Sequence, residues 1–429
     1  MKKYLSISIA FIIILISMLM LGCAMISLAD TGKSANPTTI RVMTFFAIDD
    51  PKVEQGVVEA FEKVYPNIKV QLDQVNYNDI FNKFKIDVVS GSPPDVISMN
   101  FENLFQFASL GAIQSLDDYI KRDNYDMSIY YDNTVAMHTV DDVLYGLPAT
   151  FSDVVLYYNK SMFDEAGVAY PDASWDWAKL VDVGKQFIKD TDGDGIIDTY
   201  GYGPAWWPMY LLLFNTNILT PDNSKCALTT PEALQAIQAY VDLQIKDCIS
   251  PDKDARAAQN DMERFIVGKL AMFQAGPWAV RPFNNAITDF VWDIADNPKG
   301  TVQGTFLYSN SYAITSGSKV KDAAWEFIKF ATGPEGSTIR QQGQYEISTV
   351  KSVAGSLFID SMKGISPAHP EVFMSAISYG KKLSAHPGFA EIMNIIQVEL
   401  DLVLGGQKSV IDAMTAASET VDALIQGTK

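Results

Sequence analysis

From Thr39 onward, segments typical of β-strands alternate with segments typical of α-helices, and this alternation restricts the fold more than any other feature of the chain. A β-branched and aromatic run at 39–46 precedes a helical pattern that Asp50 can cap and Pro51 can begin. The pattern repeats with a strand at 68–75, a helix at 77–91 and a short apolar strand at 95–99. This order predicts an α/β protein with mainly parallel sheets covered by helices on both faces.

The strand pattern restarts near 145–148 and continues into the apolar run at 154–159. The rest of the chain is richer in helical patterns and ends in two long amphipathic stretches, around 388–404 and 407–426. A chain of 429 residues is long enough for two or three domains, at about 150 residues each. The sequence therefore predicts a second α/β unit after the first.

The first 23 residues indicate export from the cytoplasm. Lys2 and Lys3 precede an apolar stretch that ends at Leu21-Gly22-Cys23, the order of charge and apolarity found in secretory signals. Leu-Gly-Cys also resembles the bacterial lipobox, whose cysteine receives a diacylglycerol and becomes the new N-terminus after cleavage. We expect a lipoprotein signal peptide at 1–22, a lipid on Cys23 that anchors the protein to the cell membrane, and a tether at 23–37.

Two other outcomes stay open for this segment. Cleavage after Ala29 would release a free protein, and an uncleaved segment is nearly long enough to span a bilayer. In each case the rest of the chain works outside the cytoplasm.

Charge excludes one class of partner. The chain has 51 acidic and 33 basic residues, a formal net charge of −18. Residues 1–22 contain two lysines and no acid, so the remainder carries −20. A nucleic-acid-binding protein needs the opposite sign.

Cys226 and Cys248 are the two cysteines beyond Cys23. Export permits a disulfide between them. A helix predicted from Thr230-Pro231 to about Ile245 would be about 22 Å long, whereas a disulfide needs Cα atoms within about 7 Å. Both flanks of the helix would therefore have to fold back along it to bring the two cysteines together. Two separate thiols are favoured, although the disulfide stays possible.

The common catalytic motifs are absent from the sequence. His138, His369 and His386 lie far apart and outside any zinc-binding pattern, and no nucleophile elbow, phosphate-binding loop or dinucleotide fingerprint joins a strand to a helix. The many carboxylates leave one enzymatic alternative, a surface-anchored glycoside hydrolase with paired acids.

Eight segments, in one order along residues 60–414, resemble the extracellular sugar-binding proteins of ABC importers, the family that includes maltose-binding protein. They are AFEKVYPNIKV (60–70), SGSPPDVISM (90–99), ASLGAIQSLDDYI (108–120), YGLPATFSDVVLYYNKSMFDEAGV (145–168), SWDWAKL (174–180), ERFIVGKLAMFQAGPWAV (263–280), KVKDAAWEFIKFATGPEG (319–336) and LVLGGQKSVIDAM (402–414).

The resemblance implies a periplasmic-binding-protein-like fold of two lobes joined by a three-segment hinge. We expect an N-terminal lobe of 38–150 plus 309–355 and a C-terminal lobe of 151–308 plus 356–429. It implies a monomer that is not an enzyme and needs no cofactor. Such a protein captures a short neutral oligosaccharide in the interlobe cleft, at the carboxyl ends of strands, and delivers it to the transmembrane subunits of an ABC permease.

Sugar rings need aromatic platforms for their C–H faces. Trp278 follows Gly276-Pro277, as in the family motif whose tryptophan stacks on sugar. Trp206 and Trp207 are adjacent in a Pro-bracketed loop, where alternation lets only one side chain face the cleft, and we favour Trp206. Two further aromatic candidates are Tyr210 and Phe45.

The hydroxyl rim of a sugar needs planar polar groups. Ser152 and Asp153 lie at the expected first hinge crossing, and Asn100 and Glu102 follow the strand at 95–99. The resemblance adds two weaker candidates, Asn310 and Tyr345.

An acidic loop is a candidate for structural calcium. Asp190, Asp192 and Asp194 alternate before a glycine, as in the first half of an EF-hand loop, and the Ile196 carbonyl and Asp198 could add ligands. Gly201 occupies the position of the bidentate glutamate, so weak affinity is expected.

Overall fold

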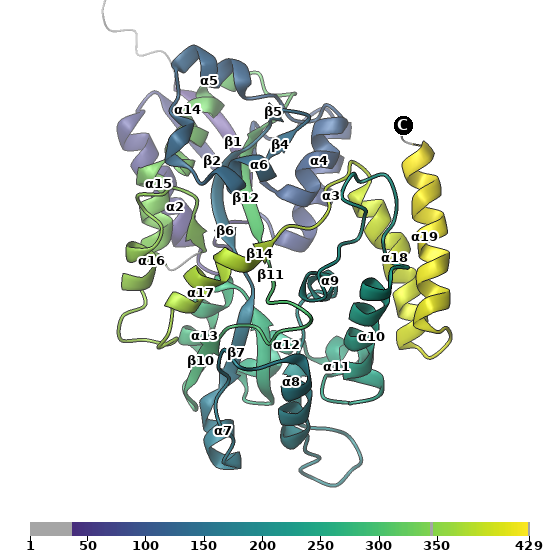
Figure 1. Ribbon diagram of the computed structural model, residues 1–429. Coiled ribbons are helices and arrows are strands. Elements are labelled where there is room, and N and C mark those ends of the chain that lie inside the picture. The colour runs from purple at the N-terminus through teal and green to yellow at the C-terminus, as the bar shows by residue number, and fades with distance from the viewer. Residues whose placement is uncertain (1–36, 344–345, 428–429) are drawn as a thin grey trace, which may run out of the picture.

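The computed structural model describes residues 37–343 and 346–427. The predicted signal peptide, Cys23 and almost all of the tether lie outside the described residues, as does Tyr345. Two mixed α/β lobes are stacked one above the other (Figure 1). Among the described residues, no helix combines the length and the apolar character that a membrane span requires.

The first lobe contains a six-stranded sheet of order β13-β6-β12-β3-β1-β2. Its strands are β1 (Thr38–Thr44), β2 (Ile68–Gln74), β3 (Val96–Asn100), β6 (Leu147–Ser152), β12 (Tyr308–Ile314) and β13 (Ile347–Ser348). Its helices are α2 (Pro51–Val64), α3 (Tyr77–Val89), α4 (Phe101–Ser109), α5 (Asp117–Asp123), α6 (Asp132–Met137), α14 (Lys321–Thr332) and α15 (Pro334–Gln342). A small hairpin of β4 (Thr139–Val140) and β5 (Val143–Leu144) completes this lobe.

The second lobe contains a four-stranded sheet of order β10-β7-β9-β8. The strands are β7 (Val155–Asn159), β8 (Tyr200–Gly203), β9 (Leu270–Ala275) and β10 (Trp292–Ala295), with a separate pair of β11 (Thr305–Phe306) and β14 (Gly380–Lys381). The helices are α7 (Lys160–Ala166), α8 (Trp177–Gly184), α9 (Pro208–Leu213), α10 (Pro231–Ile245), α11 (Lys253–Ala258), α12 (Asp261–Ile266), α13 (Val280–Ala286), α16 (Ser356–Asp360), α17 (Glu371–Ala376), α18 (Phe389–Leu404) and α19 (Val410–Gly427).

The expectation of mainly parallel sheets is wrong in detail, because both sheets are mixed. β1 pairs in parallel with β2 and β3, and β8 with β9, whereas the other pairings in these two sheets are antiparallel. The physical reason lies in the connection between the lobes. The chain leaves the first lobe along β6 and returns along β12, so these neighbouring strands must run in opposite directions.

The chain passes between the lobes three times. It passes directly from β6 to β7 through Asp153 and Val154, and back from β11 to β12 through Leu307. The third passage is near Val353, which packs in the core of the first lobe, while the next residue, Ala354, packs against the second. Helices α18 and α19 then lie side by side next to α10 (Figure 1).

Local sequence signals explain where two of the helices begin. The Asp50 carboxylate accepts a hydrogen bond from the Lys52 amide at 3.2 Å at the start of α2. The Thr230 hydroxyl does the same for the Ala233 amide at 3.3 Å at the start of α10. Each cap is followed by proline at the first helical position, where the missing N–H costs nothing. Cys226 is a buried free thiol and Cys248 an exposed one, so the favoured arrangement of two separate thiols is confirmed.

Candidate ligand-binding cavity

A cavity of about 790 Å³ lies between the two lobes. Its volume is within the range of small-molecule pockets. The lining residues come from both lobes, with α18 of the second lobe included: Phe45, Ile48, Asp49, Tyr77, Asn78, Asn100, Glu102, Asn103, Trp206, Met262, Trp278, Pro282, Tyr308, Asn310, Glu346, Phe389, Ala390 and Met393. Of the described residues, those that line the cavity include three carboxyl groups and no basic side chain.

The cavity walls lie where several strands end. Phe45 directly follows β1, Asn100 ends β3, and Glu102 is in the first turn of α4. On the opposite side, Trp206 follows β8 and Trp278 follows β9. Because strand ends of both sheets meet between the lobes, residues far apart in the sequence converge there.

Trp278 is partly buried and lies in a short 3-10 turn between β9 and α13. Its indole meets the Tyr308 ring edge to face, with 5.6 Å between ring centroids. A Cβ atom on Gly276 would collide with this indole and with the Asp153 carbonyl oxygen. Glycine is therefore needed at 276, because the tryptophan folds back over it toward the cavity.

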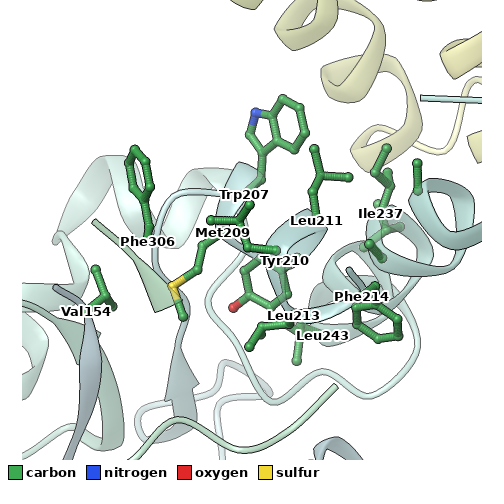
Figure 2. Packing of buried hydrophobic residues seen from close by; sticks show 14 of the residues in the cluster. Val154, Trp207, Met209, Tyr210, Leu211, Leu213, Phe214, Ile237, Leu243 and Phe306 are labelled. Carbon is green, nitrogen blue, oxygen red and sulfur yellow. The ribbon is translucent and has the colours of Figure 1, made fainter. Parts of the chain in front are cut away.

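The two adjacent tryptophans separate as alternation requires. The Trp206 side chain is 38% exposed and lines the cavity between Phe306 and Phe389. Trp207 is buried in the apolar core of the second lobe, next to the start of α9 (Figure 2). The inclusion of Trp207 among the ligand-binding candidates is thus not supported by its position.

Tyr210 also lies in the core and does not line the cavity (Figure 2). Its hydroxyl is 3.0 Å from that of Tyr202 and donates to Gln274 Oε1 at 3.2 Å. Tyr210 was expected to contact ligand, but its position on α9 directs its side chain into the core, away from the cavity.

Asn100 and Asn310 are held in fixed orientations. Asn100 Nδ2 donates to the Tyr77 hydroxyl at 2.7 Å, and its Oδ1 accepts from the Asn103 amide at 3.0 Å. Asn310 Nδ2 donates to the Glu346 carboxylate at 3.0 Å, which also accepts from the Thr150 hydroxyl. Hydrogen bonds to other protein groups therefore orient both asparagine side chains at the cavity wall.

Glu102 differs from the other described polar residues that line the cavity, because its Oε2 atom is buried without a hydrogen-bond partner. The residue is 7% exposed, and burial raises the pKa of its carboxyl to about 8. An unpartnered buried carboxyl group is costly. A hydrogen-bonding group of a ligand in the cavity would satisfy it.

Ser152 and Asp153 were expected in the cavity, but both are completely buried and neither lines it. β6 lies inside its sheet between β13 and β12, so neighbouring chain covers the crossing that follows it. Both carboxylate oxygens of Asp153 lack hydrogen-bond partners, and burial raises the pKa of this group well above its usual value. These residues belong to the hinge rather than to the cavity surface.

Several lining residues were missed by sequence reasoning. Tyr308 lies two residues before Asn310 on β12, so the period of two in a strand could have found it. Glu346 adjoins the candidate Tyr345, which lies outside the described residues. Phe389 and Met393 come from α18, and no local signal connects them to the strand ends that form the rest of the cavity wall.

The acidic loop brings three of its four carboxylates together. Asp190, Asp192 and Asp194 are exposed and can place carboxylate oxygens within 4.8 Å of one another. Asp198 instead accepts hydrogen bonds from the amide and hydroxyl of Thr191. Three carboxylates suit a hard cation, but they are fewer than the six to eight oxygens that Ca²⁺ prefers. Calcium, with the Ile196 carbonyl as a ligand, stays a prediction.

Two α/β lobes, three crossings between them and an aromatic and acidic cavity in the cleft define a class: two-lobed solute-binding proteins. A family model described as "Bacterial extracellular solute-binding protein" matches residues 48–338, and the chain belongs to this family.

Named relatives and solved structures resemble the chain over most of its length. The galactooligosaccharide-binding protein of Bacillus subtilis is 26% identical, over 71% of this chain and 72% of the relative. A maltooligosaccharide ABC transporter solute-binding lipoprotein of Streptococcus pneumoniae is 22% identical, over 95% and 93%. An ABC substrate-binding protein from Listeria monocytogenes, solved in complex with cycloalternan, superposes with a TM-score of 0.84 at 24% identity, covering 91% of this chain and 99% of that one.

Proposed function

We propose that this protein is the substrate-binding component of an ABC sugar importer, which captures a short neutral oligosaccharide between its lobes and delivers it to the permease. The observation that carries the proposal is the cavity itself. Trp206 and Trp278 provide aromatic surface, while Asn100, Glu102 and Asn310 provide polar groups within the same space. This combination suits the apolar faces and hydroxyl rims of sugar rings.

Charge narrows the ligand class. The described lining residues include Asp49, Glu102 and Glu346 but no cation, so an anionic sugar would find no positive charge to compensate its own. Hydroxyl groups can donate to these carboxyl oxygens. The names of the relatives from Bacillus subtilis and Streptococcus pneumoniae support an oligosaccharide in particular.

Calorimetric titration tests the ligand class. The titrants are xylo-, malto-, cello-, manno- and galactooligosaccharides, with galacturonate oligomers as the anionic control. We expect saturable binding of at least one neutral series and none of the galacturonates. The same mixtures, analysed by chromatography after prolonged incubation, should contain no shortened sugars. Shortened products would favour the glycoside hydrolase, and no binding by any neutral series would contradict the proposal.

We also propose that the mature protein is a monomer anchored to the cell membrane by a lipid on Cys23. The lipoprotein relative supports this anchor. Mass spectrometry of membrane-extracted protein should detect a diacylglycerol adduct at Cys23, and Cys23→Ala should remove it. A native N-terminus at Asp30 would contradict the anchor.

A further inference from the structure

The Trp206 wall of the cavity is held by a side chain that does not line it. Gln274 lies near the end of β9 and is 3% exposed. Its Oε1 atom accepts hydrogen bonds from the Ala205 amide at 3.1 Å and from the Tyr210 hydroxyl at 3.2 Å. Because Ala205 directly precedes Trp206, this one oxygen fixes the backbone from which the indole extends.

The other end of the same amide reaches toward the hinge. Gln274 Nε2 donates to Asn297 Oδ1 at 2.9 Å, and Asn297 Nδ2 donates to the Val154 carbonyl at 2.5 Å. Thr305 binds the same segment twice, since its hydroxyl accepts from the Val154 amide at 3.0 Å and donates to the Val154 carbonyl at 2.5 Å. A continuous buried network therefore links the Trp206 loop to the first crossing between the lobes.

We propose that Gln274 is a positioning residue for solute binding, which acts through Trp206 by fixing the loop at Ala205 and joining it, through Asn297, to the hinge at Val154. Its effect on sugar affinity rests on the function proposed above, but its effect on Trp206 does not. A buried polar group is held in place when all of its hydrogen bonds are made. Leaving one of them unmade costs free energy, because no water is available to replace the missing partner. In the arrangement that the structure shows, both the oxygen and the nitrogen of the Gln274 amide have hydrogen-bond partners.

Three variants separate positioning from general stability. Gln274→Met keeps the volume and removes all the hydrogen bonds of the amide. Gln274→Glu keeps an acceptor for Ala205 and Tyr210. Tyr210→Phe is the matched control, because it removes one of the two donors to the same Oε1 atom and leaves the bond from Ala205 intact.

The first readouts need no ligand. Exchange of the Ala205 amide should be slowed in the parent protein, and Gln274→Met should speed it about tenfold, the equivalent of one hydrogen bond. Acrylamide quenching of Trp206, isolated by subtracting the signal of the matching Trp206→Phe proteins, should increase in Gln274→Met. It should stay at the parent value in Gln274→Glu and Tyr210→Phe.

Affinity supplies the second readout, with xylotriose, maltotriose, cellotriose, mannotriose and galactotriose as probes. For a probe that the parent protein binds, Gln274→Met alone should raise the dissociation constant about tenfold. In a Trp206→Ala background the same substitution should leave the dissociation constant unchanged, because the effects of two substitutions on binding free energy do not add when one residue acts through the other. Equal losses in both backgrounds would overturn the proposal.

Two results decide whether Gln274 positions Trp206 even if no sugar binds, and the first of them does not need a folded methionine variant. Unprotected exchange of the Ala205 amide in the parent would overturn the proposal. So would equal Trp206 quenching in Gln274→Met and the parent. If no trisaccharide binds, the proposed function fails, while these ligand-free readouts still decide whether Gln274 positions Trp206.

Discussion

At the scale of single residues, we expect Trp278 to be the main aromatic platform for a sugar in the cavity. It lines the cavity, meets Tyr308 edge to face and requires glycine at 276. Trp278→Ala should weaken oligosaccharide binding by 2–3 kcal/mol, or about 30- to 150-fold, because it removes the surface that contacts the C–H face of the sugar. Calorimetry and thermal unfolding of the same preparation check this expectation, and the unfolding temperature should change little.

The adjacent tryptophans provide the control for that experiment. Trp206→Ala should reduce affinity with a small change in stability. Trp207→Ala should instead destabilise the protein by about 3–5 kcal/mol, the usual cost of removing a large core side chain, and leave the affinity of the folded fraction unchanged. If Trp207→Ala lost affinity and Trp206→Ala lost stability, the assignment of the cavity wall would be reversed.

Glu102 should make stability depend on pH. Its pKa is raised by burial from about 4.5 to about 8, so the folded protein holds a proton that the unfolded chain releases. Its contribution is therefore fully present below about pH 4.5 and is lost as pH rises through about 8. Glu102→Gln should raise the unfolding temperature relative to the parent at pH 9 and have less effect at pH 4.5. An equal shift at both pH values would show that Glu102 does not titrate in this range.

At the scale of elements, the acidic loop between α8 and β8 is the candidate for calcium. Three exposed carboxylates can converge, and Asp198 is turned toward Thr191. We expect a dissociation constant of roughly 10⁻⁴ to 10⁻³ M, the range of weak extracellular calcium sites. Titration with Ca²⁺ should move the backbone NMR signals of the loop, and Asp192→Asn should weaken the effect. Unchanged signals at 10 mM Ca²⁺ would rule out a specific site.

The elements were predictable where their signals are local. Capping by Asp50 and Thr230 marked the starts of α2 and α10. The expectation that Phe45, Asn100 and Trp278 would line one cleft came instead from the resemblance to the sugar-binding family, and all three line the cavity. The mixed direction of the sheets could not be predicted from such signals, because it depends on how the lobes are connected.

The direction in which each side chain of the site points was harder to predict than its position along the chain. Asp153 was placed correctly at a crossing, but its side chain turns into the hinge rather than into the cavity. Tyr210 is four residues after the lining residue Trp206, but its side chain lies in the core, where its hydroxyl donates a hydrogen bond to Gln274. Phe389 reaches the cavity because α18 packs across both lobes, which is a tertiary contact with no local sequence signature.

At the scale of the whole molecule, the two lobes touch directly through an ion pair and a hydrogen bond. The Arg281 guanidinium, on α13 of the second lobe, pairs with the Asp50 carboxylate of the first lobe and donates to the Gly343 carbonyl at 2.6 Å. Both charged side chains are about a quarter exposed, so solvent screens their attraction in part, and a ligand bound by both lobes would add its own contacts across the cleft. A bound sugar should therefore shift the population toward the closed arrangement.

Small-angle X-ray scattering tests this account most directly. The radius of gyration is measured without sugar and with a saturating concentration of the oligosaccharide that binds most tightly by calorimetry. A ligand held between the lobes should reduce the radius, and Trp278→Ala at the same sugar concentration should show a smaller reduction. Identical curves for the parent protein with and without bound sugar would contradict capture by closure of the lobes around the cavity.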